Sequence, residues 1–169
     1  VVWTHERPEQ LPRPQSHDLP LPTADMRVQW TRGADGPQFR DHDVARCIHC
    51  VDGLVFGLAL GGGGAKGMAH LGVIEVLGRE GIFFDSVAGT SAGAIMSAGY
   101  AMGKSPEMLL DLMLKEMTPP GWLRPLPKNR ELFLLTQFRM GWIEPKFREH
   151  LQNVQFEELL LPASLVTVD

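Results

Sequence analysis

The residues with the clearest chemical potential form the pentapeptide GTSAG at positions 89–93. It has the pattern G-x-S-x-G, which is typical of a serine held on a sharp turn between a strand and a helix. Gly89 and Gly93 relieve the crowding of such a turn, so the hydroxyl of Ser91 is exposed at the start of the helix. The pattern indicates a nucleophile, provided that the surrounding chain supplies the other parts of a catalytic site.

A second glycine-rich segment, GGGGAKG at positions 61–67, separates an apolar run from a helix-like segment. One interpretation is dinucleotide binding, because Gly62, Gly64 and Gly67 match the fingerprint G-x-G-x-x-G between a strand and a helix. That fingerprint also needs an acid at the end of the second strand to hold a ribose. Asp85 stands at about the right distance but precedes the strand residues SVAG, so it would lie at the wrong end.

Two other interpretations of the glycines can be compared. A phosphate-binding Walker loop fails, because Lys66 is followed by Gly67 where that motif needs serine or threonine. An oxyanion hole fits, since glycine N–H groups could point at a developing negative charge beside the positive end of a helix dipole. Its candidate donors are Gly62, Gly63 and Gly64. We favour a hydrolase and keep a non-catalytic or dinucleotide-binding α/β module as the alternative.

The base that would activate Ser91 does not follow the usual hydrolase order. That order places an acid and then a histidine after the serine, and only His150 follows it here. His70 fits a helix-face residue better than a base, because no acid is placed to orient it. We therefore expect a carboxylate to activate the serine directly.

The chain around both glycine-rich segments alternates between strand-like and helix-like patterns. Apolar residues 54–60 and 82–89 predict two buried strands, and residues 65–81 and 90–103 predict the helices that follow them. This order predicts an α/β fold, a parallel sheet with crossover helices. Both glycine-rich loops then leave the same carboxyl edge of the sheet, where such folds place their sites.

Further elements follow the predicted serine turn. Ser105 and Pro106 are suited to begin a helix over 105–117. Beyond it, the patterns predict a surface loop, another helix over 143–154 and a strand over 161–169.

Composition and the remaining segments limit the classes of function. A net charge of −4, without a run of basic residues, makes nucleic acid an unexpected partner. Residues 1–37 contain six prolines and predict a linker or the tail of an upstream domain, followed by a short helix near 39–48. Cys47 and Cys50 lack a second pair of ligands, so we expect reduced cysteines and no metal site.

The motifs GGGGAKG and GTSAG, in this order and spacing, resemble the patatin-like phospholipases over about residues 53–169. The preceding DHDVARCIHCVDGLVFGLAL also looks like the lead-in of the neuropathy target esterase branch of that family. There the lipase domain follows cyclic-nucleotide-binding-like domains. The resemblance implies a three-layer α/β/α domain over 53–169, C-terminally truncated, after a Pro-rich linker and short lead-in helix over 1–52.

The same resemblance implies the roles of the site residues. It makes Ser91 the nucleophile of a Ser-Asp dyad, with Gly62, Gly63 and Gly64 as the oxyanion loop and Lys66 at the basic position of the motif. The family's dyad aspartate lies in a downstream Asp-Gly motif, and these 169 residues hold no Asp-Gly pair after the serine. We therefore expect the 169 residues alone to be catalytically inactive, and Asp169 is given no role.

The expected partners and location follow from this family assignment. The substrate would be a lysophospholipid, a phospholipid or a related lipid ester, and no cofactor is expected. Residues 86–103 are uncharged but too rich in glycine and serine to span a membrane. We expect a cytoplasmic protein with peripheral membrane contact, for which Trp122, Leu123 and Leu126 are the candidates.

Overall fold

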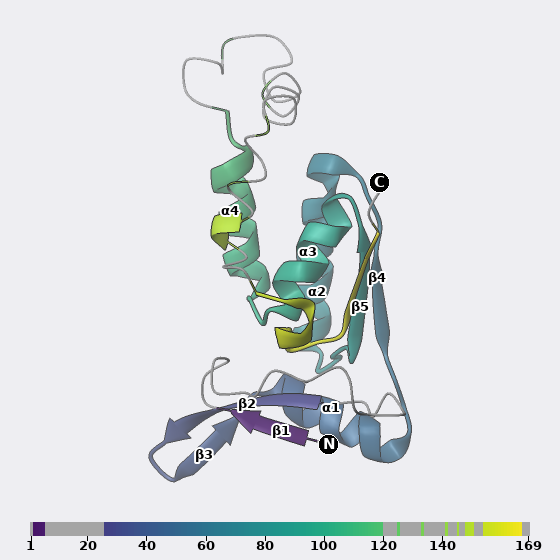
Figure 1. Ribbon diagram of the computed structural model, residues 1–169, viewed down its shortest axis with the longest axis vertical. Coiled ribbons are helices and arrows are strands. Elements are labelled where there is room, and N and C mark those ends of the chain that lie inside the picture. Colours follow the sequence, from purple (N-terminus) through teal and green to yellow (C-terminus); the bar gives the residue numbers. More distant parts are fainter. Residues whose placement is uncertain are drawn as a thin grey trace.

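The computed structural model describes residues 2–5, 26–119 and 154–166, together with positions 125, 133, 141, 145 and 148–150. The described strands form two three-stranded sheets, β1-β2-β3 and β4-β5-β6 (Figure 1). In chain order the elements are β1 (Val2–His5), β2 (Met26–Gly33), β3 (Gly36–Phe39), α1 (Asp41–Asp52), β4 (Gly57–Leu60), the 3₁₀ turn η2 (Gly64–Met68), α2 (Ala69–Arg79), β5 (Ser86–Thr90), α3 (Ala92–Ala101), α4 (Pro106–Met117), the 3₁₀ turn η3 (Phe156–Glu158) and β6 (Ala163–Val166).

The sheet β4-β5-β6 is parallel throughout. Leu60, the last residue of β4, pairs with Gly89, the penultimate residue of β5. Thr90 at the end of β5 pairs with Val166 at the end of β6. The three strands therefore end at one carboxyl edge, and the two glycine-rich loops leave this edge from neighbouring strands, as the sequence predicts.

The helices α2, α3 and α4 lie on one side of this sheet (Figure 1). Gly81 ends α2 with a φ of +74°, which allows the Ile82 N–H to donate to the Leu77 carbonyl at 2.8 Å. Ser105 caps α4, where its Oγ accepts the Met108 N–H at 3.2 Å. Both ends are those that the sequence predicts, and the α/β fold is confirmed.

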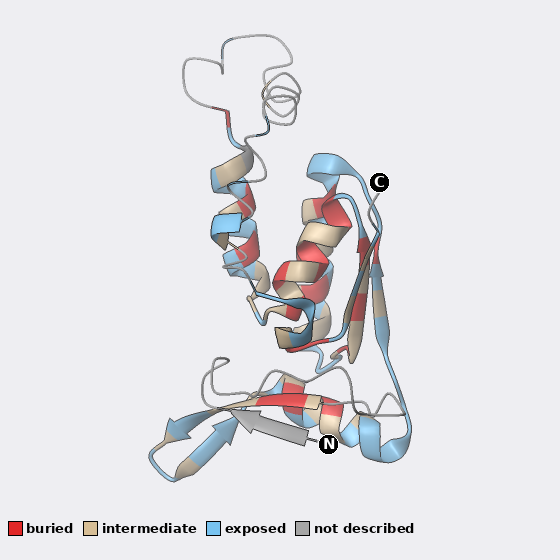
Figure 2. Ribbon diagram, viewed as in Figure 1, coloured by how far each residue is buried: buried red, intermediate tan, exposed pale blue. Residues whose placement is uncertain are grey.

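The main core lies between the helices and the sheet, where the buried residues of Figure 2 gather. In β4, Leu60 is buried and Leu58 packs against the same cluster, whereas Ala59 between them is exposed. This alternation is the period of two expected when one face of a strand is covered. The buried members of the cluster are Leu60, Leu71, Ile74, Met96, Leu109 and Met113.

The expectation that residues 1–37 form a linker is wrong for the segment that begins at Met26. Strands β2 and β3 form an antiparallel hairpin in which Gly33 pairs with Gly36 across a two-residue turn, and β1 runs parallel to β2. The proline content of residues 1–37 favours a linker, and for this reason the sequence pattern does not predict the hairpin. Pro37 is tolerated because β3 is an edge strand, where a missing N–H costs little.

Helix α1 joins this small sheet to the larger domain through buried charges. Asp43 is fully buried and accepts the Gln29 N–H of β2 at 3.0 Å. Its carboxylate also accepts two hydrogen bonds from Arg40, at 3.0 and 3.1 Å. Arg46, 3% exposed, lies 3.6 Å from Asp43 and donates to the Leu160 carbonyl at 3.0 Å. Removing Asp43 would leave the buried Arg46 without its charge partner, so this cluster fixes α1 in place.

His42 of α1 makes a second attachment to the domain. Its Nε2 lies 2.8 Å from the Phe84 carbonyl oxygen, which can only accept, so Nε2 carries the proton. The ring also stacks between Phe83 and Tyr100, with ring centroids 5.3 and 5.5 Å away. Burial lowers the pKa of His42 from its ordinary 6.5; Arg46 lowers it further, while the Phe84 carbonyl opposes the shift.

This shift predicts a dependence of stability on pH. The unfolded chain takes up a proton at His42 near its ordinary pKa of 6.5, while the folded chain stays neutral to lower pH. The free energy of unfolding should therefore fall as the pH drops below 6.5, until the folded pKa is passed. The substitution His42→Gln keeps an N–H donor but cannot titrate, so it should flatten this slope.

The measurement is urea denaturation of wild type and His42→Gln between about pH 8 and about pH 5. Equal losses of stability in the two proteins would show that His42 does not carry the dependence.

Candidate active site

Ser91 stands between the end of β5 and the start of α3 in a strained conformation. Its φ of 52° and ψ of −123° make it the non-glycine residue with positive φ within the described part of the chain. Such a conformation costs on the order of 1–3 kcal/mol and is maintained only where the surrounding structure imposes it. The side chain is exposed, and its hydroxyl makes no hydrogen bond to a described residue. The serine is therefore presented to solvent at the helix start, as the sequence predicts.

The two glycines of GTSAG are required by close backbone contacts. A Cβ added at Gly93 would lie 2.2 Å from the carbonyl oxygen of Leu60, at the end of the neighbouring strand. A Cβ at Gly89 would lie 2.4 Å from the Gly93 carbonyl oxygen and 2.6 Å from the Ser97 hydroxyl. No side chain fits at either position, so these glycines let α3 begin directly against β4 and β5.

The glycine-rich loop after β4 lies against the serine turn. A Cβ at Gly62 would come within 3.2 Å of the Ser91 Cβ, and one at Gly67 within 2.7 Å of the Ala92 Cβ. Gly64 has a φ of +55°, a conformation that residues with a side chain rarely adopt. The structure thus brings together the two segments that the sequence predicts to meet.

The remaining loop residues are less constrained. Gly63 has a φ of 163° and a ψ of 12°, and its carbonyl accepts the Lys66 N–H at 3.2 Å. A Cβ at Gly63 would meet only ordinary contacts, the nearest at 3.7 Å. Lys66 is exposed on η2. Its contacts within the described residues indicate no role for its ammonium group.

Asp85 cannot serve the alternative dinucleotide site. It lies just before β5, at the amino end of the strand, whereas the glycine-rich loop follows the carboxyl end of β4. Its Oδ2 accepts the Phe56 N–H at 2.8 Å and lies 3.0 Å from Nδ1 of His49. The carboxylate therefore ties the starts of β4 and β5 to α1, and it is not available to hold a ribose beside the glycines.

Neither histidine considered from the sequence contacts the serine. His70 Nε2 lies 2.9 Å from the Gly61 carbonyl oxygen, and His150 Nε2 lies 3.5 Å from Glu116. Within the described residues, no carboxylate is hydrogen-bonded to Ser91 either. Asp169 lies outside the described residues, as do Trp122, Leu123 and Leu126.

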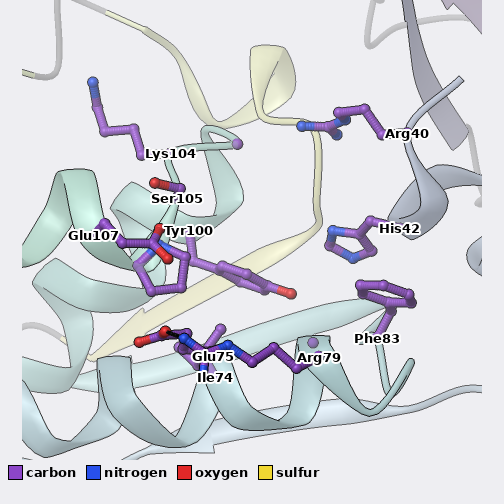
Figure 3. Close-up of a pocket in the computed structure, with 13 residues that line it drawn as sticks. Arg40, His42, Ile74, Glu75, Arg79, Phe83, Tyr100, Lys104, Ser105 and Glu107 are labelled. Carbon is purple, nitrogen blue, oxygen red and sulfur yellow. Dashed lines mark hydrogen bonds and ion pairs between the residues drawn. The ribbon is translucent and has the colours of Figure 1, made fainter. Parts of the chain in front are cut away.

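A pocket of about 340 Å³ lies at the opposite end of α3 from the serine (Figure 3). Its lining includes Arg40 and His42 at the start of α1, Phe83 between α2 and β5, and Tyr100 and Lys104 at the carboxyl end of α3. Burial raises the pKa of Tyr100 to about 12, so the phenol stays neutral there. The pocket therefore lies where His42 of α1 packs against the domain. Within the described residues, no cluster of side chains could hold a metal ion.

Comparison with known proteins places the chain in a family. Residues 58–168, well over half of the chain, match the family described as patatin-like phospholipase. The chain therefore belongs to the patatin-like phospholipase family, and the resemblance seen in the sequence is confirmed.

Its curated relatives are named as lysophospholipases or as patatin-like phospholipase domain-containing proteins. Lysophospholipase NTE1 of Mycosarcoma maydis is 47% identical over 68 residues, which are 40% of this chain and 4% of that protein. A Caenorhabditis elegans patatin-like phospholipase domain-containing protein, ZK370.4, is 47% identical over 62 residues, or 37% and 5%. Patatin-like phospholipase domain-containing protein 6 of Homo sapiens is 29% identical over 136 residues, or 77% and 10%. The chain spans at most about a tenth of the length of these relatives.

The close contacts at the serine turn predict opposite effects of alanine at two glycines. Gly93→Ala should destabilise the domain by several kcal/mol, on the order of 3 or more, because backbone atoms of β4 must move to admit the methyl group. Gly72→Ala on α2 should stabilise it by about 0.5–1 kcal/mol, because nothing lies within 4 Å of the added Cβ. Thermal unfolding of both variants tests this. A Gly93→Ala protein as stable as wild type would contradict the close approach of Gly93 to the Leu60 carbonyl.

Proposed function

We propose that the chain supplies the nucleophile and oxyanion loop of a serine acyl hydrolase acting on lysophospholipids, phospholipids or related lipid esters. The observation that carries the proposal is the close approach of Gly62 to Ser91. A Cβ added at Gly62 would lie 3.2 Å from the Ser91 Cβ. A strained, exposed serine without a glycine loop would be only a turn. A glycine loop without a serine would favour a binding site, so their juxtaposition supports acyl transfer.

The proposed reaction begins with attack of the Ser91 Oγ on the ester carbonyl carbon. The carbonyl π electrons move to the oxygen, and N–H groups of Gly62, Gly63 and Gly64 stabilise the oxyanion. The helical run that starts at Gly64 adds the positive end of its dipole. Removal of one such donor typically lowers kcat by about 10²–10³.

The proton of the serine hydroxyl passes to a base, which we propose to be the carboxylate of a Ser-Asp dyad. Collapse of the tetrahedral intermediate breaks the ester C–O bond, and the leaving alcohol takes the proton. Water then attacks the acyl-serine and loses a proton to the same carboxylate. Collapse of this second tetrahedral intermediate breaks the bond to the Ser91 Oγ, which takes that proton, and the fatty acid is released. Two observations support this base: His70 is hydrogen-bonded to the Gly61 carbonyl and His150 lies beside Glu116, away from Ser91, and the family uses such a dyad.

The substrate class is supported by the relatives. Several of them carry the name lysophospholipase, including NTE1 of Mycosarcoma maydis and of Saccharomyces cerevisiae. A lysophospholipid is therefore the first substrate to assay. We also propose a cytoplasmic protein that reaches its substrate by peripheral contact with a membrane. Within the described residues, no helix is both long and apolar enough to cross a bilayer.

Peripheral contact is testable with liposomes. In the full-length protein, combined Trp122→Asp and Leu123→Asp should reduce co-flotation with phosphatidylcholine liposomes, because charges oppose insertion of an apolar surface. The matched control is Val51→Asp on α1, an 86% exposed apolar residue. Flotation that is unchanged by the double substitution would rule out this contact.

The nucleophile is testable by covalent labelling. In the full-length protein, Ser91→Ala should abolish both labelling by a fluorophosphonate and hydrolysis of p-nitrophenyl esters, without a loss of stability. Ser164→Ala, a change at an exposed serine of β6, is the matched control and should leave both unchanged. Wild-type activity in Ser91→Ala would show that another residue attacks the ester.

A further inference from the structure

The proposed mechanism leaves one contact at the glycine-rich loop unexplained. His70, in the first turn of α2, lies with its Nε2 2.9 Å from the carbonyl oxygen of Gly61. A carbonyl oxygen can only accept a hydrogen bond, so Nε2 carries a proton and donates it. Both the neutral Nε2–H tautomer and the imidazolium ion can make this bond.

The carbonyl that His70 holds belongs to a peptide bond between two glycines. Gly61 follows the last residue of β4, so its carbonyl is outside the sheet ladder. In the described part of the chain, the carbonyl accepts no hydrogen bond other than the one from His70. Because Gly61 and Gly62 have no side chains, their own conformational preferences do not fix the peptide between them. A separate interaction is needed to fix its orientation.

The orientation of this peptide decides where the Gly62 N–H points. In a trans peptide the carbonyl and the following N–H point to opposite sides. Drawing the Gly61 carbonyl toward α2 therefore directs the Gly62 N–H away from α2. Gly93 also lies close to this carbonyl oxygen, since an added Cβ there would lie 2.7 Å from it. Gly62 itself lies against Ser91, so a change in this peptide occurs beside the nucleophile.

We propose that His70 is a positioning residue, which holds the Gly61–Gly62 peptide in the orientation that the oxyanion loop requires. This inference rests on the proposed function, because it needs an oxyanion to form beside Gly62. His70 is not the general base, since the proton-bearing nitrogen faces the backbone carbonyl and not Ser91. Its effect should appear in the stabilisation of the transition state and not in substrate affinity.

The test uses the full-length protein and a lysophospholipid substrate. His70→Leu removes the donor and should lower kcat about tenfold, less than the loss of a whole oxyanion donor, with KM changed by no more than about twofold. His70→Gln can place an amide N–H near the position of Nε2 and should recover most of kcat. Because both protonation states of His70 can donate this bond, replacing it with glutamine, which does not titrate, should leave the pH–rate profile of wild type unchanged.

Val73→Ala is the matched control, because Val73 is 53% exposed on the same helix and outside the site. It should leave kcat unchanged and report any general effect of altering α2. If His70→Leu fails to fold, His70→Gln still decides: a collapse of kcat comparable to that of Ser91→Ala, or an altered pH profile, would overturn the proposal.

Wild-type kcat in a folded His70→Leu protein would overturn this inference while leaving the hydrolase proposal intact. Loss of the hydrolase proposal would be recognised separately, by activity that persists in Ser91→Ala.

Discussion

The structure depends on one close contact, the passage of the start of α3 over the end of β4. Gly93 brings its α-carbon so near the Leu60 carbonyl that a methyl group would lie 2.2 Å from that oxygen. This contact sets the distance between two loops that leave adjacent strands. Only because α3 begins so close to the sheet can Gly62 touch Ser91 and Gly67 touch Ala92. The glycines therefore serve the packing of the site as well as any binding of an oxyanion.

Helix α1 holds the amino ends of the strands, opposite the edge where Ser91 lies. His42 bonds to Phe84, and His49 pairs with Asp85, immediately before β5 begins. The strand that leads into Ser91 at its carboxyl end is thus anchored at its amino end by α1. Arg46 extends the attachment to Leu160, ahead of β6. The small sheet β1-β2-β3 joins the same network through Gln29, so the amino-terminal segment is packed against the domain.

The sequence predicts those parts of the fold that depend on residue types at neighbouring positions. Glycines at fixed spacing mark the serine turn, and Ser105 marks the start of α4, because close backbone approach and capping restrict residue type. The α1 network is different: the bond from Arg46 to Leu160 spans 114 positions, and no local pattern announces it. The hairpin β2-β3 is not predicted because the proline content of the segment outweighs its two-residue turn at Ala34 and Asp35. The bond from His70 to Gly61 had no signal, since a histidine on a helix face usually has no such role.

The account rests on the claim that the glycine-rich loop binds the oxyanion formed at Ser91. The most direct measurement is a crystal structure of the full-length protein after fluorophosphonate has labelled the serine, because the tetrahedral phosphorus places an oxygen where the oxyanion would lie. The account predicts that this oxygen lies about 2.7–3.1 Å from one or more N–H groups of Gly62, Gly63 and Gly64. An adduct on Ser91 whose phosphoryl oxygen is bound by other groups, with the glycine N–H groups directed elsewhere, would contradict it.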